Sequence, residues 1–450
     1  MNGNASYYLC ASCGFSARMM LSLAQEQVML LEFRVRNFRS IRDEQTLSLV
    51  ASADRALAQT HLMATGLKSD PQALRSAVLY GPNASGKTSV LKALEYMRAV
   101  VAESATVIQP GQTYNVQPFR LDPVFASQPT SFELTFVLAG QRHQYAFSMT
   151  AHRIVSESLL VYRSSKPTQL FSRQHVEGDV YAYEFSTYLT GPRKLWQDST
   201  RPNSLFLSMA AQLNSEQLSP VFGWIVRSLV CLPAGAMMAP DFTTALLASE
   251  QGRQAIKSFL AAADISIADV QAVPRRGMHT KMVMSATGLH TTQEEREFLL
   301  PVFEHTTSKG SATFELHDES EGTQRLYGLI APVLDVIREG RVLVVDELDS
   351  SLHTLLVRQL ISMFHSPEQN PRGAQLIFST HDTSLLDHAQ FRRDQIWFTE
   401  KDADGATRLY PLTDFSPRKQ EAWERGYLTG RYGAVPFLAD ALVNSQTLMQ

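Results

Sequence analysis

The sequence has few cysteines, little net charge and no long apolar run, and each scarcity excludes a class of protein. Three cysteines among 450 residues, Cys10, Cys13 and Cys231, cannot form a disulfide framework, so we expect a reducing, cytoplasmic setting. The formal net charge of −3 argues against a broadly basic surface that coats nucleic acid, although a local basic patch stays compatible with it. No segment approaches ~18 uninterrupted apolar residues, so the sequence predicts no membrane span.

The composition is that of a globular protein of two or three domains, with 44% apolar and 19% charged residues. Residues 1–28 have weak patterning, and we interpret them as an appended or disordered segment. Their Cys-x-x-Cys pair has no second pair of ligands nearby, as a zinc site would need. The remaining chain divides into an N-terminal ATPase half, an inserted β-hairpin and helical region, a C-terminal ATPase half and a tail, over 29–104, 105–310, 311–400 and 401–450.

Alternating strands and helices in both halves predict an α/β fold with a mostly parallel core sheet. The insertion alternates with period two in its first part, which is typical of hairpins, and becomes helical afterwards. No sustained heptad pattern occurs, so we expect a globular insertion rather than a coiled-coil arm. The predicted strands are 31–38, 76–80, 131–137, 144–149, 181–185, 341–345 and 375–378; the predicted helical stretches are 89–101, 203–232, 242–264, 324–338 and 353–364.

The pattern G-x-x-x-x-G-K-[ST] occurs between the predicted strand 76–80 and the helix after it. Closely spaced backbone N–H groups at a helix N-terminus form a concave site for phosphate. In such a loop the lysine reaches the β- and γ-phosphates of ATP, and the hydroxyl after it binds Mg²⁺. The predicted nucleotide-binding residues are Gly81, Pro82, Asn83, Ala84, Ser85, Gly86, Lys87, Thr88 and Ser89, with Thr88 as a metal ligand.

The run Val342–Val345 leads directly into Asp346 and Glu347. A carboxylate at the end of a buried strand downstream of such a loop can hold Mg²⁺, so Asp346 is predicted as the second metal ligand. Glu347 is placed to polarise the attacking water as a general base. The alternative, in which the two carboxylates only end a strand, is disfavoured by the preceding apolar run.

Two further features flank the Asp-Glu pair in the order found in ABC-type ATPases. His381 follows the next apolar strand, where it would face the γ-phosphate. Upstream, Glu319–Gln324 resembles the ABC signature loop, with Ser320 and Gly322 in its decisive positions. A serine and bare backbone at a helix start can bind a γ-phosphate, which in that family belongs to the other subunit. Asp349 occupies the place of the D-loop, which contacts the other subunit in ABC dimers. A ring-forming AAA+ ATPase would be expected to carry an arginine finger and a sensor asparagine, and we find no such pair in the sequence.

These motifs, with Asn37–Ser40 after the first strand and the ending at 427–436, resemble OLD/RecF-like ABC ATPases. Within them the sequence is similar to the stand-alone, RloA/AbiL-like ATPases of bacterial defence loci, over roughly residues 29–437. This resemblance implies ATP and Mg²⁺ as cofactors, a homodimer or higher homo-oligomer, and a separately encoded, nuclease-like effector in phage defence. OLD proteins carry a C-terminal TOPRIM nuclease, for which the ~70 residues after His381 are too few.

Three points stay open in the sequence. Gln117 is a candidate Q-loop residue that would touch Mg²⁺, or else a surface residue. Asp402 and Asp404 could imitate a metal motif, although a hairpin turn fits them better. The favoured function is an ATP-gated switch for a partner; the alternatives are a RecF-like ATPase that binds DNA directly and, less favoured, an autonomous nuclease.

Overall fold

The computed structural model describes residues 28–67, 71–163, 166–232, 240–262, 267–285, 288–416 and 421–435. The predicted appended segment 1–28, with Cys10 and Cys13, lies outside the described residues apart from Val28. None of the described helices is both long enough and apolar enough to cross a membrane.

A seven-stranded antiparallel sheet forms one half of the molecule, in the order β10-β9-β8-β7-β6-β1-β2. The predicted hairpin between β6 and β7 is confirmed: the two residues of its turn, Ala139 and Gly140, have φ of 53° and 66°, as a two-residue hairpin turn requires. Pairing of β1 with β6 joins the first strand of the chain to the insertion. The strands are β1 (Met29–Arg36), β2 (Gln45–Ser48), β6 (Thr130–Leu138), β7 (Gln141–Met149), β8 (Ile154–Tyr162), β9 (Thr168–Glu177) and β10 (Val180–Phe185).

A six-stranded sheet, in the order β11-β15-β16-β5-β17-β18, forms the other half. Its neighbouring strands are parallel except for the final pair β17–β18. The three central strands β15, β16 and β5 are buried along their whole length, as expected of a sheet covered on both faces. The predicted α/β class with a mostly parallel core sheet is thereby confirmed. The strands are β5 (Ser76–Tyr80), β11 (Leu229–Leu232), β15 (Val342–Val345), β16 (Gln375–Ser379), β17 (Ile396–Lys401) and β18 (Thr407–Pro411).

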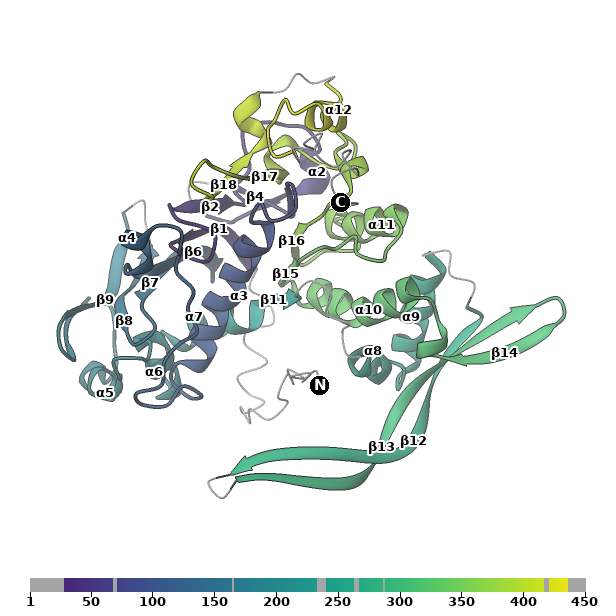
Figure 1. Ribbon diagram of the computed structural model, residues 1–450, viewed down its shortest axis with the longest axis horizontal. Helices are drawn as coiled ribbons and strands as arrows, with labels where there is room; N and C mark the ends of the chain where they lie inside the picture. Colours follow the sequence, from purple (N-terminus) through teal and green to yellow (C-terminus); the bar gives the residue numbers. More distant parts are fainter. Residues whose placement is uncertain are drawn as a thin grey trace, which may run out of the picture.

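Helix α3 (Lys87–Glu103) lies between the two sheets and contacts β1 of one and β11 and β16 of the other (Figure 1). One apolar core joins α3 to the antiparallel sheet, and a second lies between the parallel sheet and the C-terminal helices. The division at 104, 310 and 400 stays a prediction. The other elements are α2 (Ala58–His61), β3 (Leu62–Ala64), β4 (Gln72–Leu74), α4 (Pro123–Ala126), α5 (Arg193–Ser199), α6 (Phe206–Gln212), α7 (Ser219–Ser228), α8 (Asp241–Leu246), α9 (Glu250–Ala262), α10 (Glu321–Glu339), α11 (Thr354–His365), α12 (Trp423–Leu428) and the 3₁₀ turns η1 (Leu316–Asp318), η2 (Thr383–Leu385), η3 (Arg393–Gln395) and η4 (Leu412–Phe415).

The prediction of helix through residue 232 is wrong at its end. Residues Leu229–Leu232 form β11, which pairs in parallel with β15 from Leu229↔Val342 to Leu232↔Val345. Apolar spacing in the preceding helix α7 continues into these four residues, so the local pattern favours a helix. Pairing with a strand more than 100 residues later overrides that local preference.

The insertion also carries an extended arm made of β-strands, so the prediction of a globular insertion is wrong over this part. Strands β12 (Asp269–Ser285) and β13 (Gly288–Thr307) form a long hairpin that extends away from the sheets, and β14 (Gly310–Glu315) pairs with the second strand (Figure 1). At its base, Val270 and Phe303 are buried, and the Phe303 ring lies 5.2 Å from that of Tyr327 on α10. A heptad pattern predicts a coiled coil, and this arm consists of β-strands, so the absence of heptads could not exclude it.

Candidate functional site

The predicted phosphate loop lies between the buried strand β5 and the start of helix α3. Gly81 and Gly86 have φ of 151° and 121°, which side chains other than hydrogen rarely allow. A Cβ at Gly86 would lie 2.2 Å from Thr407 Oγ1, and one at Gly81 would lie 2.4 Å from the Thr399 carbonyl. Both positions therefore require glycine for two reasons: the positive φ of the backbone and the close approach of β17 and β18.

Strands β17 and β18 support this loop through hydroxyl groups. Ser85 Oγ lies 2.6 Å from Thr399 Oγ1, and Thr407 Oγ1 donates to the Ser85 carbonyl at 2.9 Å. Ser40 Oγ donates to Ser89 Oγ at 2.9 Å and lies 2.9 Å from Thr407 Oγ1. The predicted loop residue Ser89 is thus tied to the segment 37–40 and to the C-terminal hairpin.

Lys87 closes over the loop from the first turn of α3. Its buried Nζ donates to the carbonyls of Gly81 at 2.6 Å and Pro82 at 3.2 Å. Burial lowers the pKa of the Lys87 ammonium, while the carboxylates of Asp346 and Glu347 act against that shift. The cation that would meet phosphate therefore lies in the electrostatic field of the predicted metal ligand and the predicted base.

The two carboxylate oxygens of Asp346, at the end of β15, have different surroundings. Its Oδ1 accepts a hydrogen bond from Ser379 Oγ at 2.6 Å. Its Oδ2 is buried and has no hydrogen-bond partner among the described residues. A buried carboxylate oxygen without a donor is costly unless a cation completes it, so this geometry fits Mg²⁺. Asp346 would hold the ion, and the Thr88 hydroxyl at the start of α3 is the second oxygen donor available.

Glu347 follows in a strained backbone conformation. Its φ is 55°, a left-handed value that costs a residue with a Cβ about 1–2 kcal/mol. Two hydrogen bonds hold it there: its N–H donates to Ser379 Oγ at 2.8 Å, and its carbonyl accepts from Arg325 Nη2 at 2.7 Å. The half-buried carboxylate is the one predicted as general base.

The structure brings His381 next to the predicted D-loop. His381 is exposed and follows β16, and its backbone N–H donates to Asp349 Oδ2 at 3.1 Å. Asp349 Oδ1 is buried without a partner among the described residues. The two strand ends that carry Asp346 and His381 therefore meet at one edge of the sheet, as parallel neighbours must.

Ser320 and Gly322 stand at the start of α10. Ser320 is the N-cap residue, and its Oγ accepts from the Thr323 N–H at 3.2 Å. A Cβ at Gly322 would lie 2.8 Å from the Ser351 carbonyl, so this glycine allows the D-loop segment to pack on the helix. Within the described part of the chain no hydrogen bond joins either residue to the loop 81–86.

Gln117 lies in a cavity of about 330 Å³ beside the phosphate-loop helix. Its carbonyl accepts from the Arg39 N–H at 2.6 Å, and Ser89 lines the same cavity. The structure thus puts Gln117 near the residue that follows Thr88, and its role as a metal contact stays a prediction. The other lining residues are Ser40, Pro118, Phe119, Arg120, Leu121, Lys401 and Gly405.

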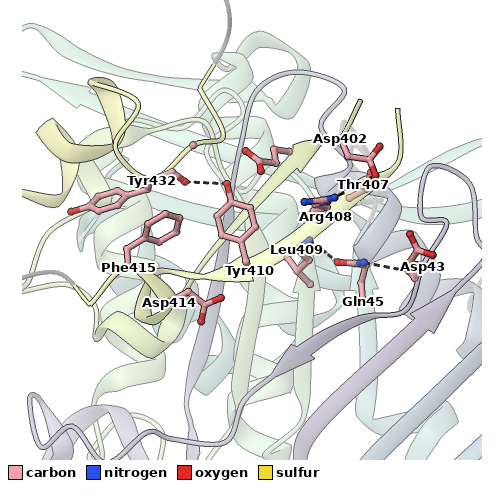
Figure 2. A pocket seen from close by; sticks show the side chains of 12 residues that line it. Asp43, Gln45, Asp402, Thr407, Arg408, Leu409, Tyr410, Asp414, Phe415 and Tyr432 are labelled. Carbon is pink, nitrogen blue, oxygen red and sulfur yellow. Dashed lines mark hydrogen bonds and ion pairs between the residues drawn. The ribbon is translucent and has the colours of Figure 1, made fainter. Parts of the chain in front are cut away.

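Asp402 and Asp404 form the predicted hairpin turn between β17 and β18. Asp402 Oδ1 accepts from the N–H groups of Asp404 and Ala406, and Arg42 pairs with both carboxylates. Across the described residues no group of three His, Cys, Asp or Glu side chains could hold a metal. A cavity of about 560 Å³ opens along β18, where Tyr410 donates to the Tyr432 carbonyl and Gln45 accepts from Leu409 (Figure 2).

Sequence reasoning missed four residues that hold the site together. Ser379 and Ser40 lie within the Ser-Thr-His-Asp and Asn-Phe-Arg-Ser motifs. Their places in these motifs could have marked them as residues of the site. Arg325 directly follows the signature-like stretch. Thr407 had no local signal, because its role depends on a strand pairing.

Comparison with solved structures finds heads of SMC proteins, at low similarity. The SMC head domain from Thermotoga maritima is 13% identical, with 85% of this chain and 98% of that chain covered and a TM-score of 0.39. A SmcHead bound to the C-winged helix domain of ScpA is 9% identical, with 85% and 97% covered and a TM-score of 0.38. A Smc head with an extended coiled coil, bound to the C-terminal domain of ScpA derived from Pyrococcus furiosus, is 10% identical, with 85% and 96% covered and a TM-score of 0.42.

A protein-family profile also matches the sequence. No curated protein matches the sequence. The profile of the family described as "AAA domain, putative AbiEii toxin, Type IV TA system" matches residues 76–387, from the strand before the phosphate loop to beyond His381. That range contains the loop, the signature-like helix start and the Asp346–Glu347 pair. The chain belongs to this family of AAA-domain P-loop proteins.

Proposed function

We propose that two copies of this chain close around two ATP–Mg²⁺ and hydrolyse them. The proposal rests on the Ser379 hydroxyl, which joins Asp346 to Glu347, and on Asp346 Oδ2, which is buried without a hydrogen-bond partner in the part of the chain that the structure describes. A metal ligand and a base are thereby fixed to each other on adjacent residues. The family match supports ATP as the substrate.

The residues of one chain divide the chemistry among them. Backbone N–H groups of the loop 81–86 and the Lys87 ammonium bind and orient the phosphates. Bound Mg²⁺ would neutralise developing negative charge on the phosphate oxygens, held by Asp346 and Thr88. The Glu347 carboxylate accepts a proton from the attacking water, and His381 contacts the γ-phosphate from the end of β16.

The second half of each site comes from the other chain. Ser320 caps α10 by accepting from the Thr323 N–H, and the N–H groups ahead of it have no partner within the helix, as at helix starts that bind phosphate. Because no hydrogen bond among the described residues joins Ser320 or Gly322 to the chain's own loop, this helix start is available to a nucleotide held by a second copy. Hydrolysis at such a composite site requires a dimer.

Substitution of Glu347 tests the chemistry. Glu347→Gln keeps the shape of the side chain and removes the base, so we expect turnover to fall ~10²–10⁴-fold. The variant should still bind ATP and should collect as a dimer, measured by light scattering with and without ATP. Undiminished turnover would disprove the base assignment, and a monomer at saturating ATP would disprove the composite site.

Substitution of Lys87 tests the loop. Lys87→Ala removes the buried cation that faces phosphate and should abolish tight binding of a fluorescent ATP analogue. Lys92→Ala, a half-exposed lysine on the same helix, is the matched control and should bind as the unmodified protein does. Equal affinity of the two variants would refute the assignment.

We propose that this ATPase is a switch for a separately encoded effector in defence against phage. Support comes from the family description, which names a toxin–antitoxin system and so a two-component arrangement. Cells that carry the locus should lose protection in plating assays with Lys87→Ala and keep it with Lys92→Ala. Protection that survives Lys87→Ala would contradict the switch, and ATP-dependent, salt-sensitive DNA binding by the purified chain alone would favour a RecF-like clamp instead.

A further inference from the structure

Arg325 connects the start of α10 to the backbone of Glu347. It lies five residues after Ser320, and its Nη2 donates to the Glu347 carbonyl at 2.7 Å. Its Nε is buried and has no acceptor among the described residues. The Arg325 side chain is half-buried, and desolvation of its charged group needs compensation, which the hydrogen bond to the Glu347 carbonyl supplies in part. The bond to Glu347 is therefore a specific contact rather than a surface encounter.

Charge around Arg325 comes from the same catalytic segment. Burial lowers the pKa of the Arg325 guanidinium, and the carboxylates of Glu347 and Asp349 oppose that shift. These are the predicted base and the predicted D-loop acid. The guanidinium thus lies in the electrostatic field of both carboxylates.

Glu347 is held from two different elements. Its N–H is fixed by Ser379 at the end of β16, and its carbonyl is fixed by Arg325 on α10. With φ at 55°, the residue has a conformation that its own chain does not favour. Loss of either bond would let the peptide turn, and the carboxylate would move with it.

Helix α10 touches the catalytic segment at a second point. Gly322 packs under the Ser351 carbonyl, with only 2.8 Å available to a Cβ. The helix start and residues 347–351 therefore form one packed unit. Because a helix moves as a rigid body, a displacement of Ser320 also displaces Arg325 and the carbonyl that it holds.

We propose that Arg325 is a positioning residue for Glu347, and that through it the signature helix sets the orientation of the general base. The inference rests on the proposed function, because it assumes that Glu347 is the base and that Ser320 meets the other chain's nucleotide. In this proposal the start of α10 contacts the ATP bound to the partner chain. The same helix, through Arg325, sets the orientation of Glu347 in its own chain. In this proposal Arg325 acts on the reaction through Glu347 alone.

The test separates chemistry from binding. Arg325→Ala should lower kcat on the order of 100-fold, the effect typical of a misplaced catalytic group. The dissociation constant for an ATP analogue and the ATP-dependent dimer should both stay unchanged. Arg325→Lys keeps the charge and one donor and should recover part of the rate. Arg338→Ala, which removes an exposed arginine of the same helix, is the control and should leave kcat unaltered.

A double variant shows whether Arg325 acts through Glu347. In a Glu347→Gln background, Arg325→Ala should cause no further loss in single-turnover rate, because the group it positions is gone. An equal loss in both backgrounds, a full rate in Arg325→Ala, or nucleotide binding weakened in parallel with kcat would each overturn the inference. If Arg325→Ala proves unstable in a thermal melt, Arg325→Lys in the same two backgrounds gives the decision.

Failure of the proposed function looks different. It is shown by a Glu347→Gln protein that hydrolyses ATP normally, whatever Arg325 does. A slow Glu347→Gln protein beside a fast Arg325→Ala protein would leave the base assignment intact and remove only the positioning role.

Discussion

Ser379 Oγ donates to Asp346 Oδ1 at 2.6 Å and accepts a hydrogen bond from the N–H of Glu347 at 2.8 Å. One short side chain from β16 therefore fixes both functional residues at the end of β15. The arrangement depends on the parallel register, in which Val345 pairs with Phe378, one residue before the serine.

Removal of that hydroxyl should weaken the metal site. We expect Ser379→Ala to raise the Mg²⁺ concentration needed for half-maximal ATPase rate ~10- to 100-fold, as loss of outer partners of metal ligands does. The measurement is a Mg²⁺ titration at saturating ATP. Ser384→Ala, a serine in the adjoining turn that contacts Asp382 instead, is the control. An unchanged Mg²⁺ requirement in Ser379→Ala would contradict the role of this bond.

The phosphate loop should tolerate no side chain at Gly86. In Gly86→Ala the new Cβ would stand 2.2 Å from Thr407 Oγ1, so the loop or β18 must shift. ATP-analogue binding should be lost and the melting temperature should fall. Gly140→Ala, with φ of 66° and open space around it, carries only the backbone cost of about 1–2 kcal/mol and should bind normally. Similar behaviour of the two variants would mean that the contact with Thr407 is unimportant.

Stability should fall on acidification below about pH 6.5 because of two buried histidines. The rings of His61 and His365 lie 3.7 Å apart, and burial lowers the pKa of both from 6.5. Below pH 6.5 the unfolded chain therefore binds more protons than the folded chain. Each pH unit lost should cost up to about 1.4 kcal/mol per histidine until the folded pKa is reached.

The measurement is urea unfolding at pH 7.5, 6.5 and 5.5. His61→Phe keeps an aromatic ring beside His365 and should reduce the slope of unfolding free energy against pH. The exposed His317→Gln should keep the slope of the unmodified protein. Equal slopes in all three proteins would show that the pair does not control acid sensitivity.

The phosphate loop, the Asp346–Glu347 pair and most strands of both sheets could be predicted from the sequence. Each depends on a local pattern: glycines at fixed spacing, an apolar run before carboxylates, or period-two alternation. Strand β11 and the long arm β12–β13 escaped prediction because distant partners, not their own residues, decide their form. Thr407 and Arg325 escaped prediction for the same reason. Thr407 binds the phosphate loop at Ser85, and Arg325 binds the carbonyl of Glu347, and neither partner is close in the sequence.

Strand β5 carries the phosphate loop and pairs with β16 on one side and β17 on the other. Both neighbours follow it by roughly 300 residues, so almost the whole chain must be synthesised before this strand has an edge to join. During translation, residues 76–80 leave the ribosome long before their partners do, as an apolar segment that needs protection from aggregation. A nascent chain should therefore acquire affinity for ATP late, only after Lys401 has emerged.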